Sequence, residues 1–163
     1  KMFRLVKVGS TVPRAVRTFA AEATNASQLT LNFTTPHTPV HVKKTVDKVI
    51  LPGIAGEYGV TAGHAPIISE LRPGVVSVVH LGGEVEKFFV NGGFALTHGN
   101  SVTDVSVPEA FPLSDFDENA VRNGHAEATR NFTASPEGSI ARATAQIEID
   151  TYTSLARALG FTL

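Results

Sequence analysis

This 163-residue sequence has no cysteine and no tryptophan, and it contains a single methionine. The absence of cysteine excludes a disulfide-stabilised scaffold, a thiolate metal site and a cysteine nucleophile. No uninterrupted apolar stretch approaches the roughly 18 residues that a membrane-spanning helix needs. We therefore expect a chain that does not cross a membrane and whose length suits one domain with a small appendage.

Charge is unevenly distributed along the chain, although the formal net charge is only −1. Residues 1–21 hold five basic residues and no acidic residue, whereas the rest holds nine basic and fifteen acidic residues. A basic, acid-free start is typical of an organellar transit peptide, and it equally fits a retained arm that docks on an acidic neighbour. We separate residues 1–27 as a basic N-terminal extension of one of these kinds. The near-neutral total does not favour a nucleic-acid partner.

Residues 28–113 carry the pattern of short β-strands. Apolar and polar residues alternate from Leu29 to Phe33, which predicts a strand with one buried face. Further runs rich in β-branched and aromatic residues follow at residues 45–51, 66–71, 75–81, 85–90, 94–97 and 102–107. Pairs such as Pro73-Gly74 and Gly92-Gly93 separate these runs, and we interpret them as turns. Many closely spaced strands without an intervening helix predict an antiparallel β-sandwich or barrel.

Residues 114–163 are predicted to form an antiparallel two-helix hairpin, because alanine becomes frequent and turn residues become rare. The first helix is expected over residues 117–132, although Gly124 weakens it by roughly 1 kcal/mol relative to alanine. Ser135-Pro136 predicts the start of the second helix, and Gly160 predicts its end. The expected fold class is thus an all-β sandwich or barrel followed by an α-helical hairpin.

No motif in the sequence indicates catalysis or a cofactor. Gly53, Gly56 and Gly59 do not lead into a helix, so they do not form a phosphate-binding loop. Gly-x-Ser-x-Gly, which would expose a nucleophilic serine, is absent. A free-standing sandwich that binds a carbohydrate or peptide stays an alternative, although Tyr58 and Tyr152 are the only tyrosines for stacking.

The histidines raise the question of a metal site. His37 and His41 are four residues apart, but neighbouring prolines prevent the helix on which that spacing would place two ligands together. His64, His80 and Glu70 are further candidates in a β-barrel metal enzyme, yet their order matches no recognisable ligand pattern. We therefore expect no metal site and predict surface or hydrogen-bonded histidines on an irregular or edge segment.

Three segments resemble a known family in their order and spacing. They are residues 52–66, which include Gly56-Glu57-Tyr58-Gly59 and Gly63-His64-Ala65-Pro66, residues 70–75 and residues 89–95. Followed by an alanine-rich helical hairpin, these segments are similar to the central-stalk subunit of rotary ATP synthase, called delta in mitochondria and epsilon in bacteria and chloroplasts. The resemblance extends over residues 28–163.

The sequence departs from this family at two places. Ala62 stands where proline usually precedes the Gly-His pair. Some bacterial members bind ATP through an Ile/Leu-Asp-x-x-Arg-Ala motif at the first helix, where this chain reads Phe116-Asp117-Glu118-Asn119-Ala120-Val121. Because Ala120 replaces the arginine that would meet phosphate charge, we expect no bound nucleotide and no other cofactor.

The resemblance implies a non-catalytic rotor subunit that couples rotation of the c-ring to the gamma shaft and hence to ATP synthesis. Implied partners are gamma, the c-ring loops and, at the helical hairpin, the mitochondrial epsilon subunit. The implied contact residues on the c-ring and gamma side are Gly56, Glu57, Tyr58, Gly59, Gly63 and His64, with Gly92 and Gly93 in a turn. Glu57 is expected at the tip of a 56–63 loop against the c-ring, and His64 at the gamma face.

The basic extension, the missing ATP motif and the sequence Gly93-Phe94-Ala95-Leu96-Thr97-His98 favour a mitochondrial member. Such a subunit is peripheral to the inner membrane on its matrix side. A chloroplast or bacterial member is the alternative within the family.

Overall fold

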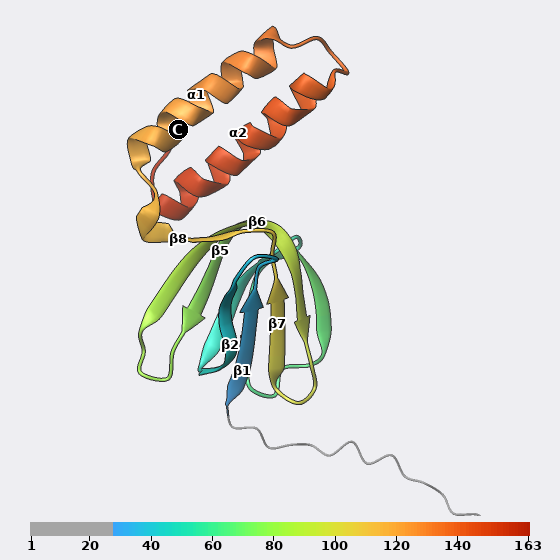
Figure 1. Cartoon of the computed structure of the whole chain (residues 1–163), viewed down its shortest axis with the longest axis vertical. Coiled ribbons are helices and arrows are strands. Elements are labelled where there is room, and N and C mark those ends of the chain that lie inside the picture. The colour runs from blue at the N-terminus through green and yellow to red at the C-terminus, as the bar shows by residue number, and fades with distance from the viewer. Residues whose placement is uncertain (1–27) are drawn as a thin grey trace, which may run out of the picture.

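The computed structural model describes residues 28–163. Strands form the lower part of this region and a helical hairpin lies on top of them (Figure 1). The predicted fold class, a β-sandwich followed by a helical hairpin, is confirmed. The basic extension, with its transit-peptide and docking-arm interpretations, lies outside the described residues.

The described region contains eight strands, one short 3-10 helix and two α-helices. The strands are β1 (Leu29–Thr34), β2 (Pro39–Val46), β3 (Lys48–Gly53), β4 (Gly56–Thr61), β5 (Ile67–Val79), β6 (Val85–Thr97), β7 (Val102–Ser106) and β8 (Ala110–Pro112). The helical segments are η1 (Leu113–Asp115), α1 (Glu118–Ala134) and α2 (Ile140–Leu159).

The strands follow one hydrogen-bonded path in the order β2-β1-β7-β6-β5-β3-β4, with β8 beside β6. The prediction of an antiparallel sandwich is wrong for one pair, because β1 and β7 run parallel from Thr30↔Val102 to Thr34↔Ser106. Strands β2 to β6 lie between β1 and β7 in the sequence, so no tight hairpin connects this pair and forces it to be antiparallel. β2 and β4 form the two ends of the path.

β5 and β6 are 13 residues each and run through positions predicted as turns. Pro73-Gly74 and Gly92-Gly93 lie inside these strands, which stay paired on both sides of them, from Ile67↔Thr97 to Val79↔Val85. The prediction that Gly92 and Gly93 form a turn is therefore wrong. Their φ angles of 94° and 138° are accessible to glycine, so the strand bends there without ending.

The bend changes which side chains point into the core. In β6, Val90 is buried before the bend and Ala95 and Thr97 after it, so the buried positions shift from even to odd numbers. The first part of β6 pairs with β8 and the last part with β7. Figure 1 shows β5 and β6 arching over the top of the sandwich, so each contributes to both of its layers.

One apolar cluster fills the sandwich. Its buried members are Leu29, Leu31, Phe33, Val46, Val49, Leu51, Val60, Leu71, Val76, Val78, Val90, Ala95, Val105 and Val107. Leu29, Leu31 and Phe33 are fully buried, which confirms the alternation predicted for β1. Burial of each such side chain contributes about 1.5–3 kcal/mol, so β1 is a central element of the fold.

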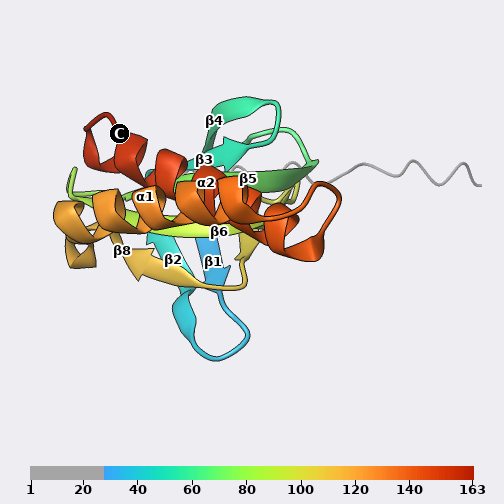
Figure 2. The same ribbon diagram turned by 90° about the horizontal axis from the view of Figure 1, so that it is seen from above.

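A second apolar cluster joins the hairpin to the sandwich. It contains Phe89 from β6, Val121 from α1, and Leu155 and Ala156 from α2. Figure 2, seen from above, shows the hairpin lying across β6. Because Val90 faces the sandwich core and Phe89 faces this cluster, both faces of this part of β6 are covered.

The helix ends follow capping chemistry. Asp117 caps α1 by accepting a hydrogen bond from the Asn119 backbone N–H, and Gly160 ends α2 in the left-handed conformation, as predicted. The predicted start of α2 at Pro136 is wrong, because α2 begins at Ile140 with Ser139 as its N-cap. Among the described residues, no helix is long and apolar enough to cross a membrane.

Candidate partner-binding surfaces

The predicted contact residues do not share a loop. Residues 56–59 lie on β4, which pairs with β3 from Gly53↔Gly56 to Lys48↔Thr61, and the turn before it is Ile54-Ala55. The prediction of a 56–63 loop with Glu57 at its tip is therefore wrong, since an edge strand accommodates these glycines in extended pairing. Gly63 and His64 follow the far end of β4, roughly 20 Å away at about 3.3 Å per residue.

The Glu57 end of β4 lies near the helical hairpin. Glu57 is exposed and lines a cavity of about 200 Å³ together with Arg72 of β5 and Arg157 of α2. The next side chain, Tyr58, packs against the sandwich core, and its buried hydroxyl has no hydrogen-bond partner among the described residues. Glu57 thus lines the same cavity as two basic side chains.

The His64 end of β4 is fastened to a different part of the molecule. The Gly63 backbone N–H donates to Ser101 Oγ at 2.8 Å, which ties this turn to the one between β6 and β7. His64 is half-buried, and its Nδ1 lies 2.7 Å from the backbone carbonyl oxygen of Ala65. His64 therefore presents its ring on a turn whose backbone position is fixed.

An exposed apolar face lies on β5 and β6 beside the turn that precedes β4, and the sequence did not reveal it. Ile68 of β5 and Leu96 of β6 are paired across the strands, and Phe94 occupies the next outward position of β6. Ile54 joins them, because its backbone N–H donates to the Glu70 carbonyl at 3.0 Å. Ile68 is 75% exposed and Phe94 60% exposed. We call Ile54, Ile68, Phe94 and Leu96 the apolar face; adjacent exposed apolar side chains of this kind mark a protein interface.

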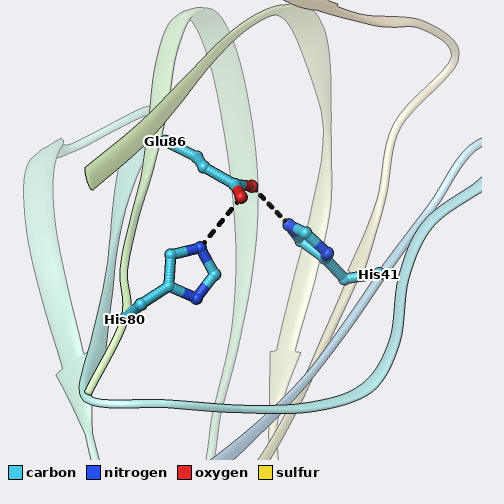
Figure 3. A group of neighbouring side chains, drawn as sticks. All are labelled: His41, His80 and Glu86. Carbon is cyan, nitrogen blue, oxygen red and sulfur yellow. Dashed lines mark hydrogen bonds and ion pairs between the residues drawn. The ribbon is translucent and has the colours of Figure 1, made fainter. Parts of the chain in front are cut away.

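A polar cluster lies elsewhere on the sandwich (Figure 3). His41 Nε2 is 2.8 Å from Glu86 Oε2, and His80 Nε2 is 3.0 Å from Glu86 Oε1. The prediction of a hydrogen-bonded histidine on an edge segment is confirmed for His41, which lies on β2. Glu86 was not among the sequence candidates, because nothing in the sequence relates it to a histidine 45 residues earlier.

Glu86 is held in its ionised form. Its partial burial by itself raises the pKa of the carboxyl group, but the hydrogen bond and charge interaction with His41 and then the close polar contact with His80 outweigh that effect. The pKa of Glu86 is therefore lowered. Among the described residues, His41, His80 and Glu86 form the one group of three side chains whose donor atoms lie close enough to hold a metal ion.

A sandwich with a packed hairpin and an exposed apolar face is typical of a subunit that binds other proteins in a larger assembly. The family model for "ATP synthase, Delta/Epsilon chain, beta-sandwich domain" matches residues 28–111. The chain therefore belongs to the delta/epsilon chain family of ATP synthase.

Individual relatives give the same result. The mitochondrial ATP synthase subunit delta' of Ipomoea batatas is 46% identical over 82% of this chain and 66% of its own length. The mitochondrial ATP synthase F(1) complex subunit delta of Dictyostelium discoideum is 36% identical over 96% of this chain and 92% of its own length. This chain thus spans about two thirds of the first relative and nearly all of the second.

A solved structure also matches the fold. A chain in the Euglena gracilis mitochondrial ATP synthase superimposes with a TM-score of 0.77 and 27% identity, covering 82% of both chains. The predicted family and the role as a subunit of the central stalk of mitochondrial ATP synthase are confirmed. The alternative of a free-standing ligand-binding sandwich is set aside.

Proposed function

We propose that this chain is the non-catalytic joint of the rotor, fastening the gamma shaft to the c-ring on the matrix side of the inner mitochondrial membrane. Nucleotide chemistry is left to other subunits. The observation that carries the proposal is the apolar face, because exposed Ile68 and Phe94 require a lasting partner to keep them from water. The matched Euglena assembly comprises F1 and the c-ring, and this composition supports partners of this kind.

The apolar face is assigned to gamma. It lies on the paired strands β5 and β6, a rigid surface whose side chains are fixed by the hydrogen-bonded register. An apolar patch on a rigid element suits a permanent interface, in which the central side chains contribute most of the binding energy. His64, at the far end of β4, adds a polar contact to the same partner.

The segment Gly56-Glu57-Tyr58-Gly59 is assigned to the c-ring loops. Gly56 and Gly59 have open space where a side chain would stand, so the backbone of this edge strand can approach a partner closely. Glu57 is exposed there and offers a carboxylate to basic or amide groups. Ile54 and Ile68 of the apolar face line one hollow with Gly56, Glu57 and Tyr58, so the surfaces proposed for gamma and for the c-ring adjoin here.

The hairpin side of the molecule is assigned to the mitochondrial epsilon subunit. A groove of about 300 Å³ between the sandwich and α2 is lined by Phe89, Phe111, Ile147 and Tyr152 among others. Phe111 and Ile147 are 48% and 62% exposed, which leaves apolar surface for a small partner to cover. Docking of residues 1–27 on an acidic neighbour stays a prediction.

Ile68→Asp and Phe94→Asp test the gamma assignment. Each change places a charge in the apolar face, where burial against gamma costs about 2 kcal/mol or more. The isolated chain keeps its fold because both side chains are exposed. We expect at least about tenfold less of the variant to co-purify with gamma and the c-ring.

Val42→Asp is the matched control. Val42 is 61% exposed on β2, which β1 and β7 separate from β6 in the strand order, and it lies outside every surface assigned above. Its variant is expected to assemble as the unchanged chain does. The assignment fails if the Ile68→Asp chain assembles at the control level.

A further inference from the structure

His41, His80 and Glu86 come together from three segments that have no part in the assigned partner surfaces. His41 belongs to the edge strand β2, His80 to the turn after β5, and Glu86 to the start of β6 (Figure 3). One donor atom from each side chain lies within 4.8 Å of the other two. The three side chains therefore converge on one small volume.

We propose that His41, His80 and Glu86 bind one divalent transition-metal ion, and that zinc is the ion that fits them best. Two imidazole nitrogens and one carboxylate oxygen are a ligand set that Zn²⁺ accepts, with water in the fourth position. Imidazole ligands also suit other first-row metals, so Co²⁺ serves as a spectroscopic probe of the same site.

The distances suit a tetrahedral ion after a small movement. With metal–ligand bonds of about 2.0–2.1 Å, neighbouring donor atoms of a tetrahedral site stand about 3.3 Å apart. The nitrogen–oxygen separations are 2.8 Å for His41 and 3.0 Å for His80. These two separations are therefore within about 0.5 Å of the tetrahedral spacing, and all three donor atoms lie within 4.8 Å of one another.

The surroundings hold two of the ligands in place before an ion arrives. The His41 ring packs edge-to-face on Phe88, with ring centres 6.0 Å apart, and Phe88 packs in the same way on Phe33 at 5.4 Å. The His80 backbone N–H donates to the Glu84 carbonyl oxygen, and the His80 carbonyl oxygen accepts from the Gly83 N–H, both at 2.8 Å. Ordering the ligands therefore costs little when the ion binds.

His80 presents a buried ring nitrogen to Glu86. Its Nε2 lies 3.0 Å from Glu86 Oε1 as an ion pair that falls short of an aligned hydrogen bond. A metal ion bound between the two side chains would coordinate this nitrogen directly. The His41 and His80 side chains are 15% and 12% exposed, whereas Glu86 is 36% exposed and leaves a path from solvent.

The bound ion would tie the edge of the sheet to the β5–β6 turn. Among the described strands, β2 pairs with β1 alone, so a shared ion adds a cross-link to an element with one neighbour. The predicted effect is a more stable sandwich in the metal-bound chain, because the ion binds the folded state. This inference does not depend on the assignments of gamma and the c-ring.

The full chain, stripped of metal with a chelator, is titrated near neutral pH with Zn²⁺ by calorimetry and with Co²⁺ by visible absorption. We expect one ion per chain, the strong visible bands of four-coordinate cobalt, and a higher thermal midpoint with zinc. Failure of the unchanged chain to bind an ion one-to-one at micromolar concentration overturns the proposal, whatever the variants do.

Glu86→Gln and His80→Gln test whether these side chains are the metal ligands. Each is expected to weaken zinc binding by about 100-fold or more, since loss of an outer-shell group already costs about 10–100-fold. His98→Gln is the matched control, because His98 pairs with Asp104 at 2.7 Å without a third ligand. Far-ultraviolet circular dichroism without metal checks that each variant is folded. Unchanged affinity in folded Glu86→Gln and His80→Gln chains overturns the assignment.

Discussion

At Gly93 the backbone passes so close to its neighbours that no side chain fits. A Cβ there would lie 2.5 Å from the carbonyl oxygen of Ser106 and 3.0 Å from the Cα of Val107. The φ angle of 138° adds backbone strain for any other residue. Gly82 is the opposite case, because a Cβ there would meet no atom within 4 Å.

Gly93→Ala is therefore expected to lower the free energy of unfolding by about 3 kcal/mol, since strain and overpacking each cost about 1–3 kcal/mol. Thermal unfolding followed by circular dichroism measures the loss. Gly82→Ala is the control and should change stability by less than about 0.5 kcal/mol. Equal stabilities of the two variants would contradict the close approach at Gly93.

At the scale of the secondary-structure elements, one carboxylate links three parts of the sandwich. Asp104 of β7 accepts a 2.6 Å hydrogen bond from Asn32 of β1 and lies 2.7 Å from His98, in the turn after β6. Partial burial alone raises the pKa of Asp104, but the hydrogen bonds from Asn32 and His98 and the charge of His98 outweigh it. The pKa of Asp104 is therefore lowered in the folded chain.

This lowered pKa sets the sign of a pH effect. A carboxyl group with a folded-state pKa below its unfolded value stabilises the fold above about pH 4, and that contribution is lost as the pH falls through the folded value. The thermal midpoint is measured between about pH 3 and pH 7. In Asp104→Asn, it should fall less steeply with decreasing pH than in the unchanged chain. The loss at neutral pH is expected to be under about 1 kcal/mol, because the side chain is 43% exposed and screened. An unchanged acid slope would refute this account.

At the scale of the whole molecule, one apolar cluster holds the hairpin against the sandwich, which has its own core. Leu155 of α2 is only 4% exposed in that cluster, where it packs with Phe89 of the sandwich and Val121 of α1. Gly124 of α1 and Tyr152 of α2 also approach closely: a Cβ on Gly124 would stand within 2.6 Å of the Tyr152 hydroxyl oxygen. The glycine predicted to weaken the helix thus permits this contact.

Leu155→Ala should loosen the hairpin and leave the sandwich intact. Deletion of a buried leucine side chain costs about 2–5 kcal/mol, and here that loss falls on the hairpin and its docking. Hydrogen exchange is expected to speed up in α1 and α2 while β1 keeps its protection. Ile147→Ala, on the same helix but at a position 62% exposed, is the control and should change little. Uniformly faster exchange would mean that the two parts unfold together.

The sequence allowed the fold class to be predicted, because its strongest signals are local. Alternation identifies β1, and Gly160 identifies the end of α2. Glycines and prolines misled the prediction within β5 and β6, since a bent strand uses the same residues as a turn. A sequence pattern cannot distinguish the two, because pairing on both sides of the bend depends on neighbours distant in the chain.

The surfaces were less predictable than the fold. The resemblance singled out Glu57 and His64, but their separation by the length of β4 follows from pairing with β3. Ile68 and Phe94 read as ordinary apolar strand residues, because alternation does not say which side of a bent strand is covered. The cluster around Glu86 depends on contacts between three segments, which spacing along the chain does not encode.

The bend at Gly92 and Gly93 has a mechanical consequence. Two layers held together by side-chain packing alone can shear past each other, whereas β5 and β6 carry the covalent chain through both layers of this sandwich. Sliding one layer against the other would break the ladder of main-chain hydrogen bonds from Ile67↔Thr97 to Val79↔Val85. A torque applied to one layer is therefore transmitted to the other through the backbone, with little deformation between the two layers.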